Sequence, residues 1–203
     1  KVGLVFQYPE YQLFEETVFK DIAFGPKNMG LSGAELENRV LETCRLIGVK
    51  EEYLEKSPFD LSGGEKRRVA IAGVMAMRPE VIVFDEPTAG LDPAGRENVM
   101  KIINDYRNAV NATVIVISHS MEDMAAAADK LLVMSRGELK MFGTADEVFK
   151  NGDMLREICL NVPIVTRVFY ELKAMGADVP DDVFTVSRAV EVLKRIKAGG
   201  KGA

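Results

Sequence analysis

The fold of this chain is decided by two short stretches, LSGGE at Leu61–Glu65 and VIVFDEP at Val81–Pro87. The first has the form of a helix start, because its serine and its glutamate stand three residues apart, as the two members of a capping box do. The second is an apolar run of strand length that ends in two adjacent carboxylates. The interval between them has room for one helix. We therefore predict a helix followed by a buried strand, with acidic side chains where the strand ends.

Composition limits the classes of protein to which the chain can belong. Its 203 residues, 47% of them hydrophobic, are enough for one core with a small appended subdomain. A net charge of -5 argues against a binder of phosphate backbones, which needs a basic face. The longest apolar runs, Val81–Phe84 and Thr113–Ile117, have strand length and fall short of a membrane span. We therefore expect no nucleic-acid partner, and we expect any membrane contact to be peripheral.

The first part of the chain changes from strand to helical periodicity. It opens with a strand-like segment, Val2–Phe6, which delivers Gln7 at its end. Between about residues 17 and 78 the apolar spacing is helical, and Ser32 with Glu35 is predicted to form a capping box. We expect this block to be a helical subdomain.

Strand and helix then alternate, as in a parallel α/β fold. The predicted series is a strand at 81–85, a helix at 93–109, a strand at 113–117, a helix from 121 and a strand at 131–134. The expected fold class is therefore an α/β core built on a parallel sheet, with an inserted helical subdomain.

The chain beyond residue 150 again has helical apolar spacing, with Val179–Pro180 marking a break between two segments. The apolar residues are Ile164, Val168 and Leu172 in the first segment and Val186, Val190 and Leu193 in the second. We expect a C-terminal helical extension, which serves either as a dimer contact or as a lid on its own core. The terminal stretch 198–203 is expected to be disordered.

The first motif has the pattern of a helix N-terminus that can bind a phosphate. Ser62 stands at the N-cap and Glu65 at the third helical position, while Gly63 and Gly64 leave backbone N–H groups uncovered. The alternative is a plain capping box without a ligand. The glycine pair, the basic run at Lys66–Arg68 and the carboxylate strand that follows favour phosphate binding.

The carboxylates Asp85 and Glu86 fall at the carboxyl end of a predicted central strand, where the ligands of parallel sheets gather. Asp85 is placed to hold Mg²⁺, directly or through water, and Glu86 to polarise the water that attacks a γ-phosphate. Acidic strand ends also serve as simple helix caps. The continuation DEPTAGLDP favours the catalytic role, since Asp92 precedes Pro93 at the start of the next helix.

Two further residues follow predicted strands at the same edge. His119, the only histidine, comes after the strand at 113–117, where it can contact the γ-phosphate. Gln7 ends the first strand, where its amide oxygen can meet Mg²⁺ or the attacking water. A lone histidine is more often structural, and a lone glutamine carries no signal. The two stronger motifs favour catalytic roles for both.

In this order the motifs resemble those of ATP-binding-cassette (ABC) ATPases, and the resemblance covers most of the chain. It rests on Gln7, LSGGE, VIVFDE, the loop Ala89–Asp92 and His119. It implies that Gln7 is the Q-loop glutamine and a Mg²⁺ ligand, and that Ser62, Gly63, Gly64 and Glu65 form the signature. It implies that Asp85 is the Walker B aspartate, which holds Mg²⁺, and that Glu86 is the catalytic glutamate. It also implies that Asp92 lies at the nucleotide and that His119 is the switch histidine. It also implies an ABC-type P-loop NTPase core with ATP and Mg²⁺ as cofactors. In that family two such domains enclose two ATP molecules head to tail, so each signature faces the partner's nucleotide.

A narrower resemblance lies in QYPEYQLFEETVFKDIAFGPKNMGLS, at Gln7–Ser32, which is similar to the Q-loop region of energy-coupling factor importers. It implies a second ATPase subunit in a heterodimer, a transmembrane scaffold subunit and a substrate-binding membrane subunit. It also implies the cytoplasmic face of the cell membrane, and uptake of a vitamin or a transition metal ion such as cobalt. The candidate docking residues are Tyr8, Glu10, Tyr11 and Phe14, for which ordinary loop packing is the alternative.

The sequence also departs from the wider family. Glu65 replaces the usual signature glutamine, and Ala89–Gly90 replaces the usual Ser-Ala pair; both variants are normal for energy-coupling factor ATPases. There is no GxxxxGK[ST] stretch, the lysine-bearing loop that cradles phosphates. We therefore expect an ABC domain at 1–150 that lacks its N-terminal portion, with its sheet incomplete there, and an extension at 151–203. The chain alone is expected to be inactive.

Two alternatives stay open beside the importer ATPase. One is a non-catalytic subunit that donates its signature to a partner's ATP, although such a subunit has no evident use for Asp85, Glu86 and His119. The other is a soluble ABC ATPase outside transport, which calls for a coiled-coil insertion or a basic face. The sequence has neither.

Overall fold

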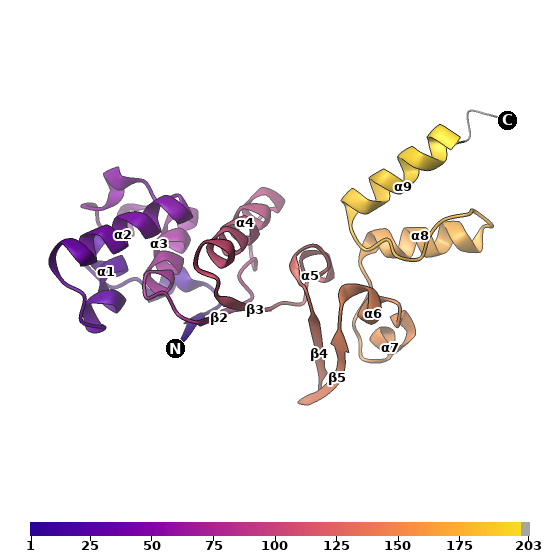
Figure 1. Ribbon diagram of the computed structural model, residues 1–203, viewed down its shortest axis with the longest axis horizontal. Helices are drawn as coiled ribbons and strands as arrows, with labels where there is room; N and C mark the ends of the chain where they lie inside the picture. Colours follow the sequence, from indigo (N-terminus) through magenta and orange to yellow (C-terminus); the bar gives the residue numbers. More distant parts are fainter. Residues whose placement is uncertain (200–203) are drawn as a thin grey trace. The chain divides into compact units, whose positions relative to one another are not determined.

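Three parallel strands form a sheet in the computed structural model, which describes residues 1–199 (Figure 1). Their order is β1 (Val2–Val5), β2 (Val81–Asp85) and β3 (Thr113–Ile117). The predicted parallel α/β core is thus confirmed, with β2 as its central strand. Parallel strands need a long crossover connection, and α4 (Pro93–Val110) provides it between β2 and β3. The N-cap of α4 is Asp92.

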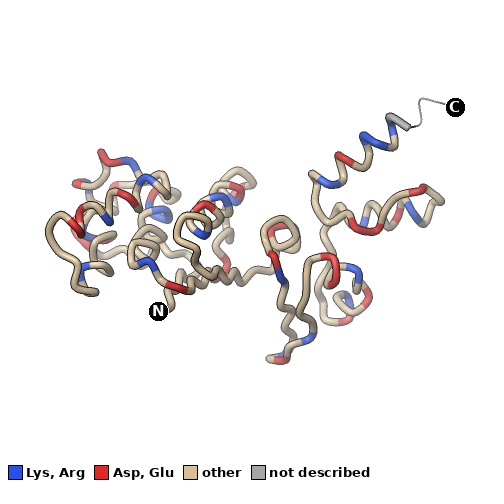
Figure 2. Tube along the Cα trace, in the orientation of Figure 1, with Lys and Arg blue, Asp and Glu red and all other residues tan. Residues whose placement is uncertain are grey.

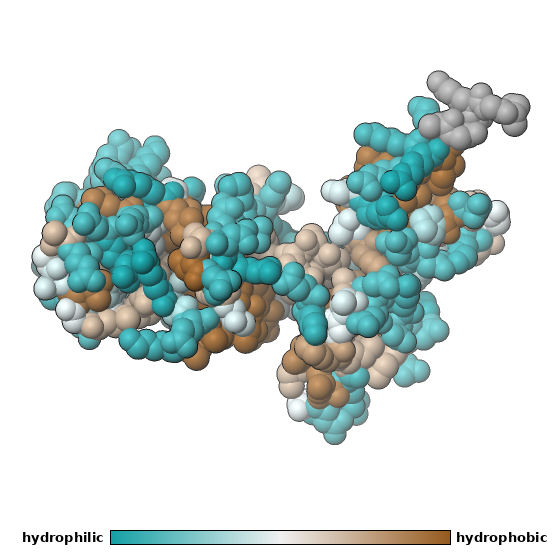
Figure 3. Space-filling model, viewed as in Figure 1, coloured by the Kyte–Doolittle hydropathy of each residue, from teal (hydrophilic) through white to brown (hydrophobic). Residues whose placement is uncertain are grey.

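One face of this sheet carries the core. Ile82 and Phe84 are both 0% exposed, and they pack in one cluster with residues of the three helices described next. The opposite face is less covered than the predicted buried strand suggests, because Val81 and Val83 are only half-buried. Figure 3 shows brown apolar surface over the strands. The exposed apolar residues of these strands are Val2, Leu4, Ile115 and Ile117.

The predicted helical block between residues 17 and 78 is confirmed. Its helices are α1 (Val18–Asn28), α2 (Gly33–Ile47) and α3 (Gly63–Met75), with short 3-10 turns η1 (Pro9–Gln12), η2 (Glu51–Tyr53) and η3 (Pro58–Asp60). The capping box predicted at Ser32 and Glu35 is wrong. Ser32 is the N-cap of α2, but its side chain makes no capping hydrogen bond. Gly33, with a φ of 53°, departs from helical geometry at the position where a capping box needs a regular first turn.

The chain forms two compact units, Lys1–Ser118 and His119 onward. In the second, β4 (Leu131–Ser135) pairs antiparallel with β5 (Glu138–Gly143). The prediction that 131–134 continues the parallel core is therefore wrong, and β5 was missed. The cause is the turn: Arg136 and Gly137 both have positive φ, 53° and 79°, and such a two-residue turn joins antiparallel strands only.

The helices of the second unit are α5 (Met121–Ala127), α6 (Ala145–Phe149), α7 (Gly152–Glu157), α8 (Ile164–Ala174) and α9 (Val186–Gly199). The two helices predicted in the tail are confirmed. The small core is formed by Phe169, Val179, Val183, Ala189 and Val192, and Leu172 packs against it. The exposed apolar residues are Ile164, Val168, Val186, Val190 and Leu193.

The division predicted at residue 150 lies within the second unit and stays a prediction. The stretch expected to be disordered, 198–203, falls partly in the last turn of α9 and otherwise outside the described residues. Among residues 1–199, no helix combines the length and the apolar character that crossing a membrane requires.

Candidate active site

The carboxyl ends of the three parallel strands lie at one edge of the sheet. The register aligns Val5 with Phe84, and Phe84 with Val116. Gln7 and Glu86 each stand two residues beyond one of these aligned positions. Because ligands of parallel sheets bind outside the carboxyl ends of the strands, this edge is the candidate site. The structure therefore brings the segments that carry Gln7, Asp85 and Glu86 to one edge of the sheet.

Asp85 is the last residue of β2 and Glu86 begins the loop that follows. Glu86 has a φ of 47°, in the left-handed region that costs energy for a residue with a side chain. Two hydrogen bonds hold this conformation: the Glu86 N–H donates to the Ile117 carbonyl at 2.9 Å, and the Ala89 N–H donates to the Glu86 carbonyl at 3.1 Å. Strained residues held in this way are concentrated at functional sites.

The loop from Glu86 ends in a capped helix. The Asp92 carboxylate accepts a hydrogen bond from the Gly95 N–H at 2.8 Å, and Pro93 occupies the first helical turn. A Cβ at Gly95 would lie 2.8 Å from the same carboxylate oxygen, so a larger residue there would displace the Asp92 side chain from its capping position. Asp92 is thus fixed as the start of α4, as predicted; its contact with a nucleotide stays a prediction.

The signature begins α3, with Ser62 as N-cap, and the predicted capping box with Glu65 is formed. The Glu65 carboxylate accepts hydrogen bonds from the Ser62 N–H at 2.9 Å and from the Ser62 hydroxyl at 2.6 Å. A Cβ at Gly63 or Gly64 would meet no atom within 4 Å, so the space over this helix start is open. Open backbone at a helix N-terminus suits an anion.

Hydrogen bonds also keep the Glu65 side chain of the signature ionised. Bonds from the Ser62 hydroxyl, the Ser62 N–H and the Tyr53 side chain lower the pKa of Glu65 from 4.5 to about 2. Glu65 is therefore a carboxylate under all physiological conditions, where the wider family resemblance expects a neutral glutamine.

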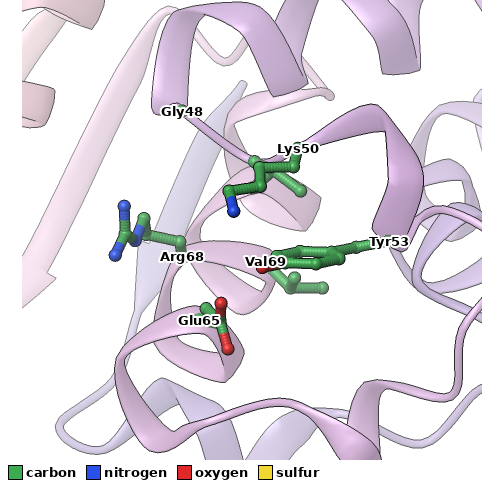
Figure 4. A pocket seen from close by; sticks show the side chains of 7 residues that line it. Gly48, Lys50, Tyr53, Glu65, Arg68 and Val69 are labelled. Carbon is green, nitrogen blue, oxygen red and sulfur yellow. The ribbon is translucent and has the colours of Figure 1, made fainter.

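A small cavity of about 70 Å³ adjoins Glu65 (Figure 4). The ring of Tyr53 lies beside it, with the Lys50 ammonium 5.3 Å from the ring centroid. Lys56 approaches the same ring at 4.7 Å. The residues that line the cavity are Gly48, Val49, Lys50, Tyr53, Glu65, Arg68 and Val69. Sequence reasoning missed Tyr53, which carries no local motif.

Helix α3 runs so that its start is at the carboxyl edge of the sheet. Near its other end, Val74 lies 3.0 Å from where a Cβ at Gly3 would be, early in β1. Near its beginning, Arg67 donates from Nη1 to the Ala89 carbonyl at 3.2 Å, in the loop after β2. The signature and the Asp85–Glu86 loop are therefore linked at the same edge.

The predicted basic run at Lys66–Arg68 is not a uniform cationic surface. Arg67 is only 4% exposed, and its Nε lies 3.3 Å from Glu10 Oε2. It therefore serves the fold and is no phosphate ligand on this helix. The sequence does indicate that Arg67 is buried, because Arg67 lies four and eight residues before the apolar residues Ile71 and Met75, on the same face of α3.

The candidate docking loop also contains both exposed residues and a residue that pairs inside the protein. Tyr8, Tyr11 and Phe14 are exposed, with Tyr8 and Tyr11 rings 6.2 Å apart and Phe14 in edge contact with Phe24. Glu10 instead pairs with the buried arginine of α3. Three of the four predicted docking residues are thus available at the surface.

His119 is two residues beyond β3 and is the first residue of the second unit. The next residue, Ser120, caps α5 by accepting a hydrogen bond from the Asp123 N–H at 3.2 Å. The role of His119 at a γ-phosphate stays a prediction.

The residues at the sheet edge fit a Mg²⁺ ion that is held partly by the nucleotide. No three His, Cys, Asp or Glu side chains within residues 1–199 are grouped to hold a metal ion by themselves. Mg²⁺ is commonly bound by one or two protein oxygens together with nucleotide phosphates and water. Asp85 and Gln7 supply oxygens of that kind.

Figure 2 shows basic and acidic residues interspersed along the helices.

Comparison with known proteins agrees with this geometry. The sequence profile of the ABC transporter family matches residues 1–89. The energy-coupling factor transporter ATP-binding protein EcfA2 of Caldanaerobacter subterraneus subsp. tengcongensis is 51% identical over 201 residues, which are 99% of this chain and 70% of that protein.

Two solved structures share the fold. One is cbiO1 from Clostridium perfringens, described as part of the ABC transporter complex cbiONQ, with a TM-score of 0.69 and 35% identity over 85% of this chain and 67% of that one. The other is the ATP-binding cassette MJ0796, a dimer bound to ADP and Pi, with a TM-score of 0.59 and 27% identity over 71% of this chain and 63% of that one. With a sheet edge, a signature helix and a sequence that all agree, the chain belongs to the ABC ATPases, in the family of energy-coupling factor transporter ATP-binding proteins.

Proposed function

We propose that the carboxyl edge of the β1–β2–β3 sheet hydrolyses ATP with Mg²⁺. The observation that carries this is the parallel register of β1, β2 and β3, which supports an edge shared by the segments that contain Gln7, Asp85 and Glu86. Asp85 and Gln7 would hold Mg²⁺ together with the nucleotide phosphates. The metal would neutralise the charge that develops on the transferred phosphoryl group.

Glu86 is the catalytic base in this proposal. It would accept a proton from the water that attacks the γ-phosphate, while His119 would contact that phosphate. The strained backbone at Glu86 supports the assignment, because such conformations persist where function requires them.

The signature, Ser62–Glu65, serves the ATP of a partner ATPase, most simply in a head-to-tail heterodimer. Support comes from the open space over Gly63 and Gly64, which leaves the helix start accessible from outside the chain. Asp92 lies in the loop that leads into α4 and belongs to the same nucleotide-facing edge.

The ATPase couples hydrolysis to uptake through membrane subunits, at the cytoplasmic face of the membrane. The exposed aromatic residues Tyr8, Tyr11 and Phe14 are the docking surface for a transmembrane scaffold, which works with a substrate-binding membrane subunit. The transported substrate is a vitamin or a transition metal ion such as cobalt. This class of substrate follows from the resemblance to energy-coupling factor importers.

The test is Mg²⁺-dependent phosphate release by the full-length protein assembled with its partner ATPase. Glu86→Gln should lower the rate by about 10² to 10⁴, since a general base contributes that much. Glu97→Gln, an exposed carboxylate in α4, is the matched control and should leave the rate unchanged. Equal rates for Glu86→Gln and wild type would refute the proposed function of this edge.

A further inference from the structure

A buried arginine joins three functional segments of the first unit. Arg67 lies in α3, five residues after the N-cap of the signature, and is 4% exposed. Its Nη1 donates to the Ala89 carbonyl at 3.2 Å, in the loop between Glu86 and Asp92. Its Nε faces Glu10 Oε2 at 3.3 Å, in the η1 segment. One side chain thus touches elements that the sequence separates widely.

The aromatic residue next to Gln7 completes this cluster. The Tyr8 ring centroid is 6.0 Å from the guanidinium carbon of Arg67. A Cβ at Gly90 would lie 3.7 Å from Tyr8 Cε1, so the ring is also against the loop after β2. Tyr8 has a φ of 58°, and its exposed side belongs to the docking surface. The cluster therefore reaches from the molecular surface to the catalytic loop.

The cluster is not fully hydrogen-bonded. Within the described residues, Arg67 Nε, Arg67 Nη2 and Glu10 Oε2 are buried without a hydrogen-bond partner, because the ion pair lacks the alignment that a hydrogen bond needs. Buried polar groups are rarely left in this way, and they gain from any movement that aligns them. A small displacement of the η1 segment relative to α3 would do so.

We propose that Arg67 is a positioning residue, which couples the η1 docking segment to the Ala89–Gly90 loop beside Glu86 and to the signature helix. A membrane subunit that moves η1 would shift the Glu10–Arg67 pair, and Arg67 would pass the shift to the Ala89 carbonyl. Arg67 touches neither nucleotide nor water in this scheme. The inference rests on the proposed function for its catalytic consequence, but the linkage itself is testable without it.

The first test is amide hydrogen exchange in the full-length protein. Glu10→Gln keeps the side-chain volume and removes the charge, and Arg67→Lys keeps the charge and loses the guanidinium fork. Both should speed exchange in the peptides 8–14 and 86–92, while the α2 peptide 36–47 stays as in wild type. Glu16→Gln removes an exposed carboxylate that forms an ion pair with Lys20, and as the matched control it should change none of the three.

Faster exchange in all three peptides would mean a general loss of stability and would overturn the inference, as would a change in only one of the two linked segments. If Arg67→Lys fails to fold, Glu10→Gln decides by the same criteria. These outcomes do not depend on whether the protein hydrolyses ATP.

The second test is ATP hydrolysis by the full-length ATPase pair, alone and assembled with its membrane subunits. Both variants should reduce the increase in kcat that assembly produces, by about tenfold, with the KM for ATP unchanged. A proportional loss of activity in both settings would indicate a structural role and contradict the coupling. A wild-type pair without hydrolysis would instead refute the proposed function, while the exchange result would still decide the linkage.

Discussion

The Glu86 amide donates a hydrogen bond to the Ile117 carbonyl at 2.9 Å, across the ends of β2 and β3. This bond continues the sheet register one residue beyond Asp85, where the backbone of Glu86 has already turned to a φ of 47°. The base proposed for hydrolysis therefore sits on backbone that is both strained and held. His119 follows Ile117 by two residues in the sequence.

The strain at Glu86 gives a stability prediction. Glycine adopts positive φ without the cost that other residues have, so Glu86→Gly should be more stable than Glu86→Ala by about 1 kcal/mol. Chemical unfolding of the two full-length variants measures this difference. Both should be inactive, since neither carries a base. Equal stability of the two variants would mean that the backbone at this residue is relaxed.

The two serine N-caps of the first unit provide a matched pair. Ser62 donates hydrogen bonds to the Glu65 carboxylate from its N–H and from its hydroxyl, whereas the Ser32 side chain makes no capping hydrogen bond. Ser62→Ala should therefore cost about 0.5–2 kcal/mol of unfolding free energy, as loss of a working cap does, and Ser32→Ala clearly less. Urea titrations of the two variants measure both values. A larger loss at Ser32 would contradict the assignment of the caps.

The lowered pKa of Glu65 predicts a pH dependence of stability. A carboxylate whose pKa is lower in the folded protein stabilises it above pH 4.5, and this contribution is lost as the pH falls toward 2. Wild type should thus be more stable than Glu65→Gln near neutral pH, and the gap should close over that acidic range. The midpoints of urea unfolding at several pH values measure the gap. A gap that is independent of pH would show that the charge of Glu65 plays no part.

The 203-residue chain by itself should not hydrolyse ATP. Its sequence contains no GxxxxGK[ST] stretch, so the β- and γ-phosphates would lack a lysine-bearing cradle. Phosphate release by the purified 203-residue chain measures this directly. Hydrolysis that requires Mg²⁺ and disappears in Glu86→Gln would prove the prediction wrong.

Local patterns in the sequence sufficed for the sheet edge. The apolar run before Asp85, the strand at 113–117 and the spacing of Ser62 to Glu65 each report a short-range preference, and all three elements form as predicted. What the sequence could not supply is pairing over distance. The Glu10–Arg67 contact joins residues far apart in the chain, and nothing local distinguishes Arg67 from its basic neighbours except its place on the buried face of α3.

The errors had different causes. The strand at 131–134 was assigned to the parallel core because alternation of strand and helix suggested it, whereas the short turn at Arg136–Gly137 commits it to a hairpin. In the tail, apolar spacing identified two helices but not which face is covered. Phe169 and Val192 are buried, while Val168 and Leu193, their neighbours in sequence, are exposed.

In the proposed function, this chain contributes a catalytic edge to one ATP and a signature to another. The direct measurement is ATP hydrolysis by the full-length protein and its partner ATPase when the site of this chain is silenced by Glu86→Gln, so that only the partner's site turns over. Adding Gly64→Asp places a negative charge in the open space over the signature, where a Cβ meets no atom within 4 Å. We expect the remaining hydrolysis to fall by about 10²-fold, because the added charge repels the γ-phosphate of the partner's ATP. Hydrolysis that is unaffected by Gly64→Asp, in a protein that still folds and pairs, would contradict it.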